Sequence, residues 1–262
     1  MVVDNKPGAS GQIAASQVAR AKPDGTQLLL DASSFAVNPS LFPELPYDSE
    51  KSFTPLAIVA LFPNVLVFSP KFEAKSVLDL IKMAKAKPGQ IAYASSGNGS
   101  AQHLAGALFE ARAGVSLVHV PYRGGAPAMN DVMAGQVPVF FANIASGLGP
   151  IKSGRLRPIA VTSRLRTQAL PGIPTMEEAG VSSYEVLEWN PVLGPADMAP
   201  QVKSTLKAAL RKAMDDPEVL DRIRALSGEV FPDGAEGRVD SFLRAQRLQW
   251  ANIIRDRKIT IG

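Results

Sequence analysis

A glycine- and serine-rich segment at residues 95–100, Ser-Ser-Gly-Asn-Gly-Ser, is the part of the sequence best suited to bind a small ligand. It lies between an apolar run at 91–94, which predicts a strand, and an expected helix at 101–113. Glycine lets the backbone turn tightly and approach a ligand closely. The amides at a helix start carry partial positive charge, so the segment predicts a carboxylate or phosphate site. A plain turn capped by Ser100 is the alternative reading.

Three other short polar segments also follow expected strands, at residues 31–34, 121–125 and 143–146. In an open α/β sheet, ligands bind outside the carboxyl ends of the strands. Several such loops together therefore indicate a binding edge more strongly than any one of them. Arg123 is the only strong cation among them, and taken singly it is more typical of a surface or structural arginine.

Catalytic and cofactor motifs are missing from these loops. Gln102 stands where a dinucleotide fingerprint needs glycine, no Gly-Lys-Ser or Gly-Lys-Thr run exists, and Ile144 stands where a nucleophile elbow needs glycine. The chain has no cysteine and two histidines, His103 and His119, which excludes thiolate chemistry and a His-rich metal site. A histidine at a helix start, such as His103, is more often a cap or a packing residue than a ligand contact. We therefore expect no catalytic residue, no metal and no cofactor.

The elements that carry these loops alternate between short apolar strands and helices up to residue 161, which predicts an α/β fold with a mostly parallel sheet. From residue 202 the pattern becomes helical. Hydrophobic residues make up 46% and charged residues 20% of the 262 residues, as in a packed globular protein. The net charge of +4 is spread along the chain, which suits a small anion and offers no nucleic-acid arm. No apolar run approaches the roughly 18 residues of a membrane span.

Several longer motifs, taken in order, resemble one family. They are residues 2–11 (VVDNKPGASG), 21–25 (AKPDG), 38–41 (NPSL), 45–48 (LPYD), 93–100 (YASSGNGS), 119–124 (HVPYRG), 160–163 (AVTS), 173–175 (IPT) and 178–180 (EAG). The sequence resembles the extracytoplasmic solute receptors of tripartite tricarboxylate transporters, the Bug family. The resemblance covers essentially the whole chain, and the serial order of the motifs makes it specific.

The resemblance implies a two-lobed α/β fold of the type II periplasmic-binding-protein class, which closes like a flytrap on a small carboxylate. It implies that residues 1–66 and 191–262 form lobe one and residues 67–190 form lobe two. It also implies a periplasmic location, a membrane permease as partner, a monomer, and no catalytic activity. The ligand-binding residues expected on this basis are Ser33, Ser34, Ser95, Ser96, Gly97, Gly99, Ser100, Tyr122, Gly124 and Asn143. Trp189 is expected either to wall the cleft or to pack at the hinge.

The chain also departs from the family pattern. It begins at Met1-Val2-Val3-Asp4-Asn5, which we expect to be the continuation of a strand. On this basis we expect the signal peptide and the first strand and helix of lobe one to be missing. We expect such a chain to be less stable and to bind more weakly than a complete receptor. Ala142 stands where the family often has aspartate, and Asn190-Pro191 stands where it has an aromatic residue and glycine.

Two other classes of function remain open at this point. A serine hydrolase or acyl transferase would use His103 or His119 as the base, although no acidic residue lies near either histidine in the sequence. A signalling or scaffold protein would instead use the receptor fold to present a surface to a partner.

Overall fold

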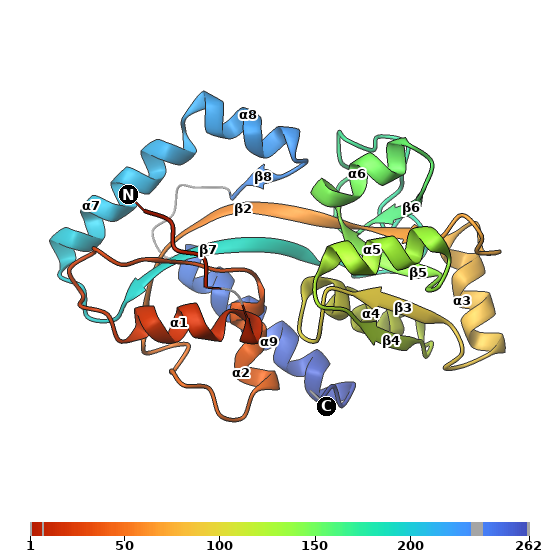
Figure 1. Cartoon of the computed structure of the whole chain (residues 1–262), viewed down its shortest axis with the longest axis horizontal. Coiled ribbons are helices and arrows are strands. Elements are labelled where there is room, and N and C mark those ends of the chain that lie inside the picture. Colours follow the sequence, from red (N-terminus) through yellow and green to blue (C-terminus); the bar gives the residue numbers. More distant parts are fainter. Residues whose placement is uncertain (1, 7, 232–237, 261–262) are drawn as a thin grey trace. The chain divides into compact units, whose positions relative to one another are not determined.

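A computed structural model describes residues 2–6, 8–231 and 238–260. The chain divides into two compact units (Figure 1). Unit 1 comprises Met1–Leu61, Trp189–Ala225 and Glu229–Gly262, and unit 2 comprises Phe62–Glu188 and Leu226–Gly228. Two long strands, β2 (Phe53–Phe68) and β7 (Leu187–Pro195), contribute residues to both units. The lobe boundaries expected from the sequence stay a prediction.

The sheet of unit 2 is mixed. Its strands follow the order β6 (Arg157–Val161), β2, β5 (Val139–Asn143), β3 (Ala92–Ser95) and β4 (Val118–Pro121). Strand β3 runs parallel to β4 and β5, whereas β2 runs antiparallel to β5 and β6. The prediction of a mostly parallel sheet was therefore wrong, because the apolar runs of β2 and β6 encode burial but not strand direction.

The helices of unit 2 are α3 (Val77–Ala86), α4 (Ala101–Ala113), α5 (Gly125–Ala134) and α6 (Ile144–Lys152). Two of these helices begin at a serine cap. The Ser76 hydroxyl accepts a hydrogen bond from the amide of Asp79 at 3.1 Å, and the Ser100 hydroxyl accepts one from the amide of His103 at 3.3 Å. Each cap satisfies an amide that has no partner inside its own helix.

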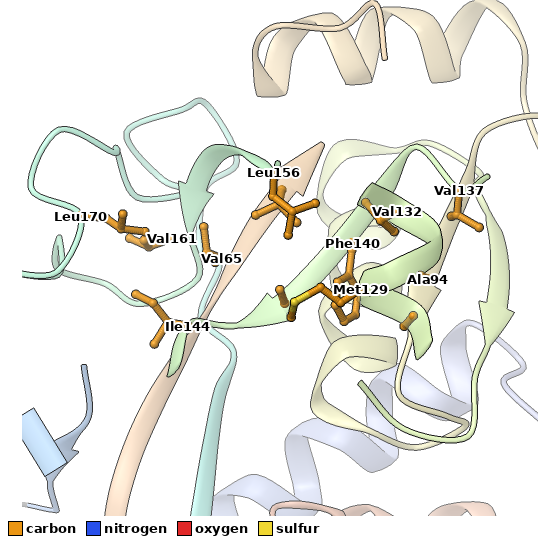
Figure 2. Close-up of a cluster of buried hydrophobic side chains, with 13 residues drawn as sticks. Val65, Ala94, Met129, Val132, Val137, Phe140, Ile144, Leu156, Val161 and Leu170 are labelled. Atoms are coloured by element: carbon orange, nitrogen blue, oxygen red, sulfur yellow. The ribbon is translucent and has the colours of Figure 1, made fainter. Parts of the chain in front are cut away.

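The core of unit 2 lies where α5 packs on the sheet (Figure 2). Val65 of β2, Phe140 of β5 and Val161 of β6 belong to the same buried cluster as Met129 and Val132 of α5, and Figure 2 shows Phe140 beside the two α5 residues. Residues 139–142 of β5 are all buried, so this strand is covered on both faces and its sequence is continuously apolar. The core therefore fixes the position of β5, whose end carries part of the site described below.

Unit 1 begins with the 3-10 helix η1 (Ala9–Gly11) and α1 (Gln12–Ala19), followed by β1 (Leu29–Leu30) and α2 (Ser34–Leu41). Its later elements are α7 (Pro200–Met214), α8 (Pro217–Ala225), β8 (Glu229–Val230) and α9 (Arg238–Asp256). Strand β1 pairs with β7, strand β8 pairs with β2, and α2 packs against α9 (Figure 1). Phe35, Trp189 and Leu243 belong to the core of this unit.

The opening residues 2–6 form no strand, contrary to the expectation from the sequence. Val2 and Val3 are 92% and 76% exposed, and no strand in the described part of the chain pairs with them. An apolar β-branched pair is not enough to make a strand, because a strand forms only where a partner accepts its backbone hydrogen bonds.

Candidate ligand-binding site

The carboxyl ends of three strands of unit 2 lie along one edge of its sheet. Strand β3 ends at Ser95, β4 at Pro121 and β5 at Asn143, and all three strands run in the same direction. Helices α4, α5 and α6 begin directly after them, so three helix N-termini gather at this edge. We call this group of strand ends and helix starts the carboxyl edge of unit 2.

Two loops at the carboxyl edge bind each other. The amide of Tyr122 donates to the carbonyl of Ser95 at 3.1 Å, and the amide of Gly124 donates to the carbonyl of Ser96 at 3.2 Å. The backbone of Gly97 lies so close to Tyr122 that an added Cβ would be 3.3 Å from the Tyr122 carbonyl oxygen. The structure thus brings together the two loops that the sequence proposed separately.

Three amides of the 95–100 loop have acceptors within the loop or on the helix that follows it. The amide of Gly97 donates to the Ser95 hydroxyl at 3.1 Å, and that of Gly99 donates to Nδ1 of His103 at 3.1 Å. The amide of Ser100 donates to the carbonyl of Gly97 at 3.2 Å. The Ser95 side chain is fully buried, and the Ser96 hydroxyl donates to Oε1 of Gln102 at 2.7 Å. The loop is therefore held rigid by its own hydrogen bonds, and direct ligand contact by these residues stays a prediction.

The start of α5 has no side-chain cap and has open space beside it. Its N-cap residue, Gly124, has a φ of 114° and supplies no side-chain cap, so the first amides of the helix have no side-chain acceptor. An added Cβ at Gly124 or Gly125 would meet no atom within 4 Å, so there is open space beside both residues. Arg123, the residue before Gly124, is exposed, and the hydroxyl of Tyr122 donates to Oδ2 of Asp131 at 2.7 Å.

The start of α6 is capped by Asn143 and approached by an acidic residue. Oδ1 of Asn143 accepts from the amide of Ala145 at 2.9 Å, while its Nδ2 donates to Oε2 of Glu188 at 2.5 Å. Ala142, where the family pattern suggested a lost aspartate, is fully buried. A carboxylate nevertheless stands at the α6 start, supplied from β7 by Glu188. Burial raises the pKa of Glu188, and the hydrogen bond from Asn143 partly opposes that rise.

The two histidines form a stacked pair behind the 95–100 loop. Their ring centroids are 3.8 Å apart with an interplanar angle of 5°. Nε2 of His119 shares a hydrogen bond of 2.6 Å with the Ser95 hydroxyl. Burial, and secondarily the neighbouring His119, lowers the pKa of His103 to about 3, and burial lowers the pKa of His119 to about 4. Both rings are therefore neutral at pH 7, and Nδ1 of His103 is the unprotonated nitrogen because it accepts from Gly99.

The contact between Ser95 and His119 does not make a hydrolytic dyad. A nucleophilic serine must be reachable by its substrate, but the side chain of Ser95 is 0% exposed. Within the described part of the chain, no carboxylate is hydrogen-bonded to His119 to orient it as a base. The pair instead fixes the shape of the 95–100 loop.

The predicted residues of unit 1 lie around the start of α2. Ser33 is buried at the N-cap position without a side-chain cap, and Ser34 is half-buried. Asp31, just before them, accepts from the amide of Ala32 through Oδ1 at 2.8 Å, and Oδ2 is buried without a partner among the described residues. Burial raises the pKa of Asp31 to about 6.

Trp189 packs in the core of unit 1. Its side chain is 0% exposed, its Nε1 donates to Oε1 of Gln246 at 3.3 Å, and its ring makes an edge contact with Phe242 at 5.2 Å. Of the two roles that the sequence left open for Trp189, packing is therefore the one that this structure supports.

Sequence reasoning missed Glu188 and the buried state of Asp31. The signal for Glu188 was present, because a single acid stands inside the apolar segment Val186-Leu187-Glu188-Trp189. A lone acid in such a segment needs a partner, and that partner, Asn143, lies 45 residues away in the sequence. Within the described part of the chain, no group of three or more His, Cys, Asp or Glu side chains could hold a metal.

Comparison with known proteins settles the family. Residues 1–259 match the tripartite tricarboxylate transporter family receptor. The chain belongs to this receptor family. BugT of Bordetella pertussis is 33% identical over 98% of this chain and 79% of its own length. A protein of Pseudomonas sp. (strain P51) from the tcbD-tcbE intergenic region is 35% identical over 97% of this chain and 76% of its own length.

Solved structures of the same receptor type share the fold. Rpa4515 of R. palustris with adipate has a TM-score of 0.89 and 30% identity, covering 99% of this chain and 87% of that one. The periplasmic binding protein BugD has a TM-score of 0.86 and 33% identity, with the same coverage. MatC of Rhodopseudomonas palustris with bound malate has a TM-score of 0.83 and 26% identity, covering 94% and 85%. The receptor chain thus has an α/β fold of the periplasmic-binding-protein type, and no helix among its described residues could cross a membrane.

Proposed function

We propose that this receptor binds a small organic acid with at least one carboxylate at the carboxyl edge of unit 2 and presents it to a membrane permease. The observation that carries the proposal is the uncapped start of α5. Gly124 and Gly125 leave open space there, and Arg123, the residue before them, is exposed. A carboxylate in this space would accept hydrogen bonds from the first amides of α5 and gain from the helix dipole and the guanidinium charge.

The spacing of the strands indicates the size of the ligand. Helices α5 and α6 follow β4 and β5, which are separated by the single strand β3. Two strand spacings are about 10 Å. The α5 start and the Asn143–Glu188 pair, which follow these two strands, would therefore face the two ends of a small dicarboxylic acid. The adipate and malate bound in the structures of Rpa4515 and MatC are acids of this general class.

The remaining parts of the proposal rest on membership of the family. We place the receptor in the periplasm, as a monomer whose partner is the permease of a tripartite transporter. No cofactor and no nucleic acid take part, and the ligand leaves chemically unchanged. The occupied amides of the 95–100 loop and the buried Ser95 fit a rigid binding wall better than a reacting centre. The hydrolase alternative gains no support from these contacts.

The test is to fill the open space at α5 with one methyl group. Gly125→Ala adds a Cβ that meets no protein atom within 4 Å, so it should leave folding intact while occupying the position of the ligand carboxylate. We expect the affinity for malate, succinate or adipate, measured by isothermal titration calorimetry, to fall by at least about tenfold.

Gly149→Ala in α6 is the matched control, because its added Cβ also meets no atom within 4 Å. It should bind these acids as the unchanged receptor does, with the same melting temperature as Gly125→Ala within about 2 °C. Equal affinities of the two variants would overturn the assignment of the α5 start. Turnover of a bound ester or amide would overturn the receptor function itself.

A further inference from the structure

Glu188 brings a carboxylate to the carboxyl edge from a strand that the sequence did not connect with it. Its Oε2 accepts a hydrogen bond of 2.5 Å from Nδ2 of Asn143. The Oδ1 atom of the same Asn143 accepts from the amide of Ala145 at the first turn of α6. The acid is therefore separated from the α6 start by a single side chain, and both groups belong to unit 2.

Half of this carboxylate is unused. No described residue forms a hydrogen bond or an ion pair with Oε1 of Glu188, and Oε1 is not among the fully buried atoms that lack partners. Its donor, Asn143, is neutral, and no cation among the residues that the structure describes pairs with the acid. Burial raises the pKa of Glu188, which reflects this uncompensated charge. An acceptor in such a place gains most from a ligand group that donates a hydrogen bond.

We propose that Glu188 is a specificity-determining residue that accepts a hydrogen bond from a hydroxyl or ammonium group of the ligand through Oε1. This inference rests on the function proposed above. The receptor then prefers a 2-hydroxy or 2-amino dicarboxylic acid to the unsubstituted acid. With the unsubstituted acid, Oε1 loses its partner and its charge lies close to the bound carboxylates without compensation. The receptor would discriminate between the two kinds of acid because Oε1 of Glu188 needs a hydrogen-bond donor, and a ligand without one leaves this oxygen unpaired.

Three acids with the same four-carbon skeleton test the preference: succinate, malate and aspartate. We expect the unchanged receptor to bind malate or aspartate at least about tenfold more tightly than succinate in calorimetric titrations. Glu188→Gln removes the charge and keeps the length of the side chain and its reach to Asn143. In this variant we expect the preference to fall to about threefold or less, with succinate binding more tightly and aspartate less tightly than before.

Glu185→Gln is the matched control. Glu185 lies three residues earlier and pairs with Arg164 at 3.0 Å on an exposed surface, and no hydrogen bond joins it to Asn143. This variant should keep the preference of the unchanged receptor. Glu188→Met, which also keeps the length and removes both oxygens, replaces Glu188→Gln if circular dichroism shows that the latter does not fold.

The possible results distinguish a failure of the role proposed for Glu188 from a failure of the proposed receptor function. If the acids bind and Glu188→Gln or Glu188→Met keeps the original preference, the role of Glu188 is refuted and the receptor function stands. If the substitution weakens succinate as much as malate, Glu188 donates to a carboxylate instead of accepting, and the inference is again wrong. If neither these three acids nor adipate binds to the unchanged receptor, the proposed function fails together with the inference.

Discussion

The stacked histidines predict how the stability of the receptor depends on pH. His103 and His119 are neutral in the fold, with pKa values lowered from 6.5 to about 3 and about 4. Because a lowered pKa means that the unfolded chain binds the proton more tightly, the stabilisation is present above pH 6.5 and is lost as the pH falls toward the folded pKa. Between about pH 8 and about pH 5, the titration of His103 should lower the free energy of unfolding by about 2 kcal/mol. The share of His119 is the smaller one, because its ring is partly exposed.

Substitutions that keep the hydrogen bond and remove the titration isolate this effect. His103→Asn can offer Oδ1 to the amide of Gly99, and His119→Gln can still bond the Ser95 hydroxyl. Each variant will be less stable than the parent at high pH because its ring contacts are lost. The gap between parent and variant should then shrink by about 2 kcal/mol for His103→Asn between about pH 8 and about pH 5. Other titrating groups, Asp31 included, cancel in this comparison.

Urea unfolding provides the measurement. Far-ultraviolet circular dichroism follows the whole chain, whereas tryptophan fluorescence reports unit 1, because the two tryptophans, Trp189 and Trp250, both belong to it. The pH-dependent change should therefore appear in the circular dichroism transition. A gap between parent and His103→Asn that stays constant within about 0.5 kcal/mol across this pH range would refute the account of the pair.

Three further predictions concern single positions. Ser100→Ala should lower the free energy of unfolding by about 1 kcal/mol in urea titrations, because α4 loses its cap, whereas Ser204→Ala on α7 should change it little. Gly106→Ala should cost several kcal/mol, because the added Cβ would lie 2.1 Å from the Tyr93 ring; a melting temperature within about 3 °C of the parent would contradict the packing described. Asp31 has its pKa raised from 3.8 to about 6, so the destabilisation by its charge grows between these two pH values and is complete above about pH 6. Asp31→Asn should therefore raise stability by about 1–3 kcal/mol at about pH 8 and much less at about pH 4, and an equal effect at both would be inconsistent with the raised pKa.

The sequence predicted local structure well where the signal was local. The helix after residue 100 and its Ser100 cap follow from the side chain, the glycines before it and the helical spacing after it. Strand direction was not predicted, because the antiparallel pairing of β2 with β5 and β6 joins segments far apart in the chain. The same limit explains why the opening Val2-Val3 pair was expected to form a strand: its propensity is visible in the sequence, but the absence of a partner strand is not.

The candidate site was predicted as a set of loops, but the hydrogen bonds inside it were not. The sequence suggested that the amides of Gly97 and Gly99 are free to bind a ligand. In the structure they donate to the Ser95 hydroxyl and to Nδ1 of His103. The open amides lie instead at the start of α5, where no side chain caps the helix. Glu188 was missed because its meaning depends on Asn143, a contact between two different strands. Residue types indicated where a ligand could bind, and the structure identified which donors remain unoccupied.

The claim that a carboxylate binds at the start of α5 is tested most directly by nuclear magnetic resonance of the backbone amides during titration with malate. The account predicts that the amide signals of Gly125 and Ala126 shift most and saturate with the ligand, while that of Gly149 in α6 stays in place. Saturating shifts confined to residues away from residues 123–126, with those amides unchanged, would contradict it.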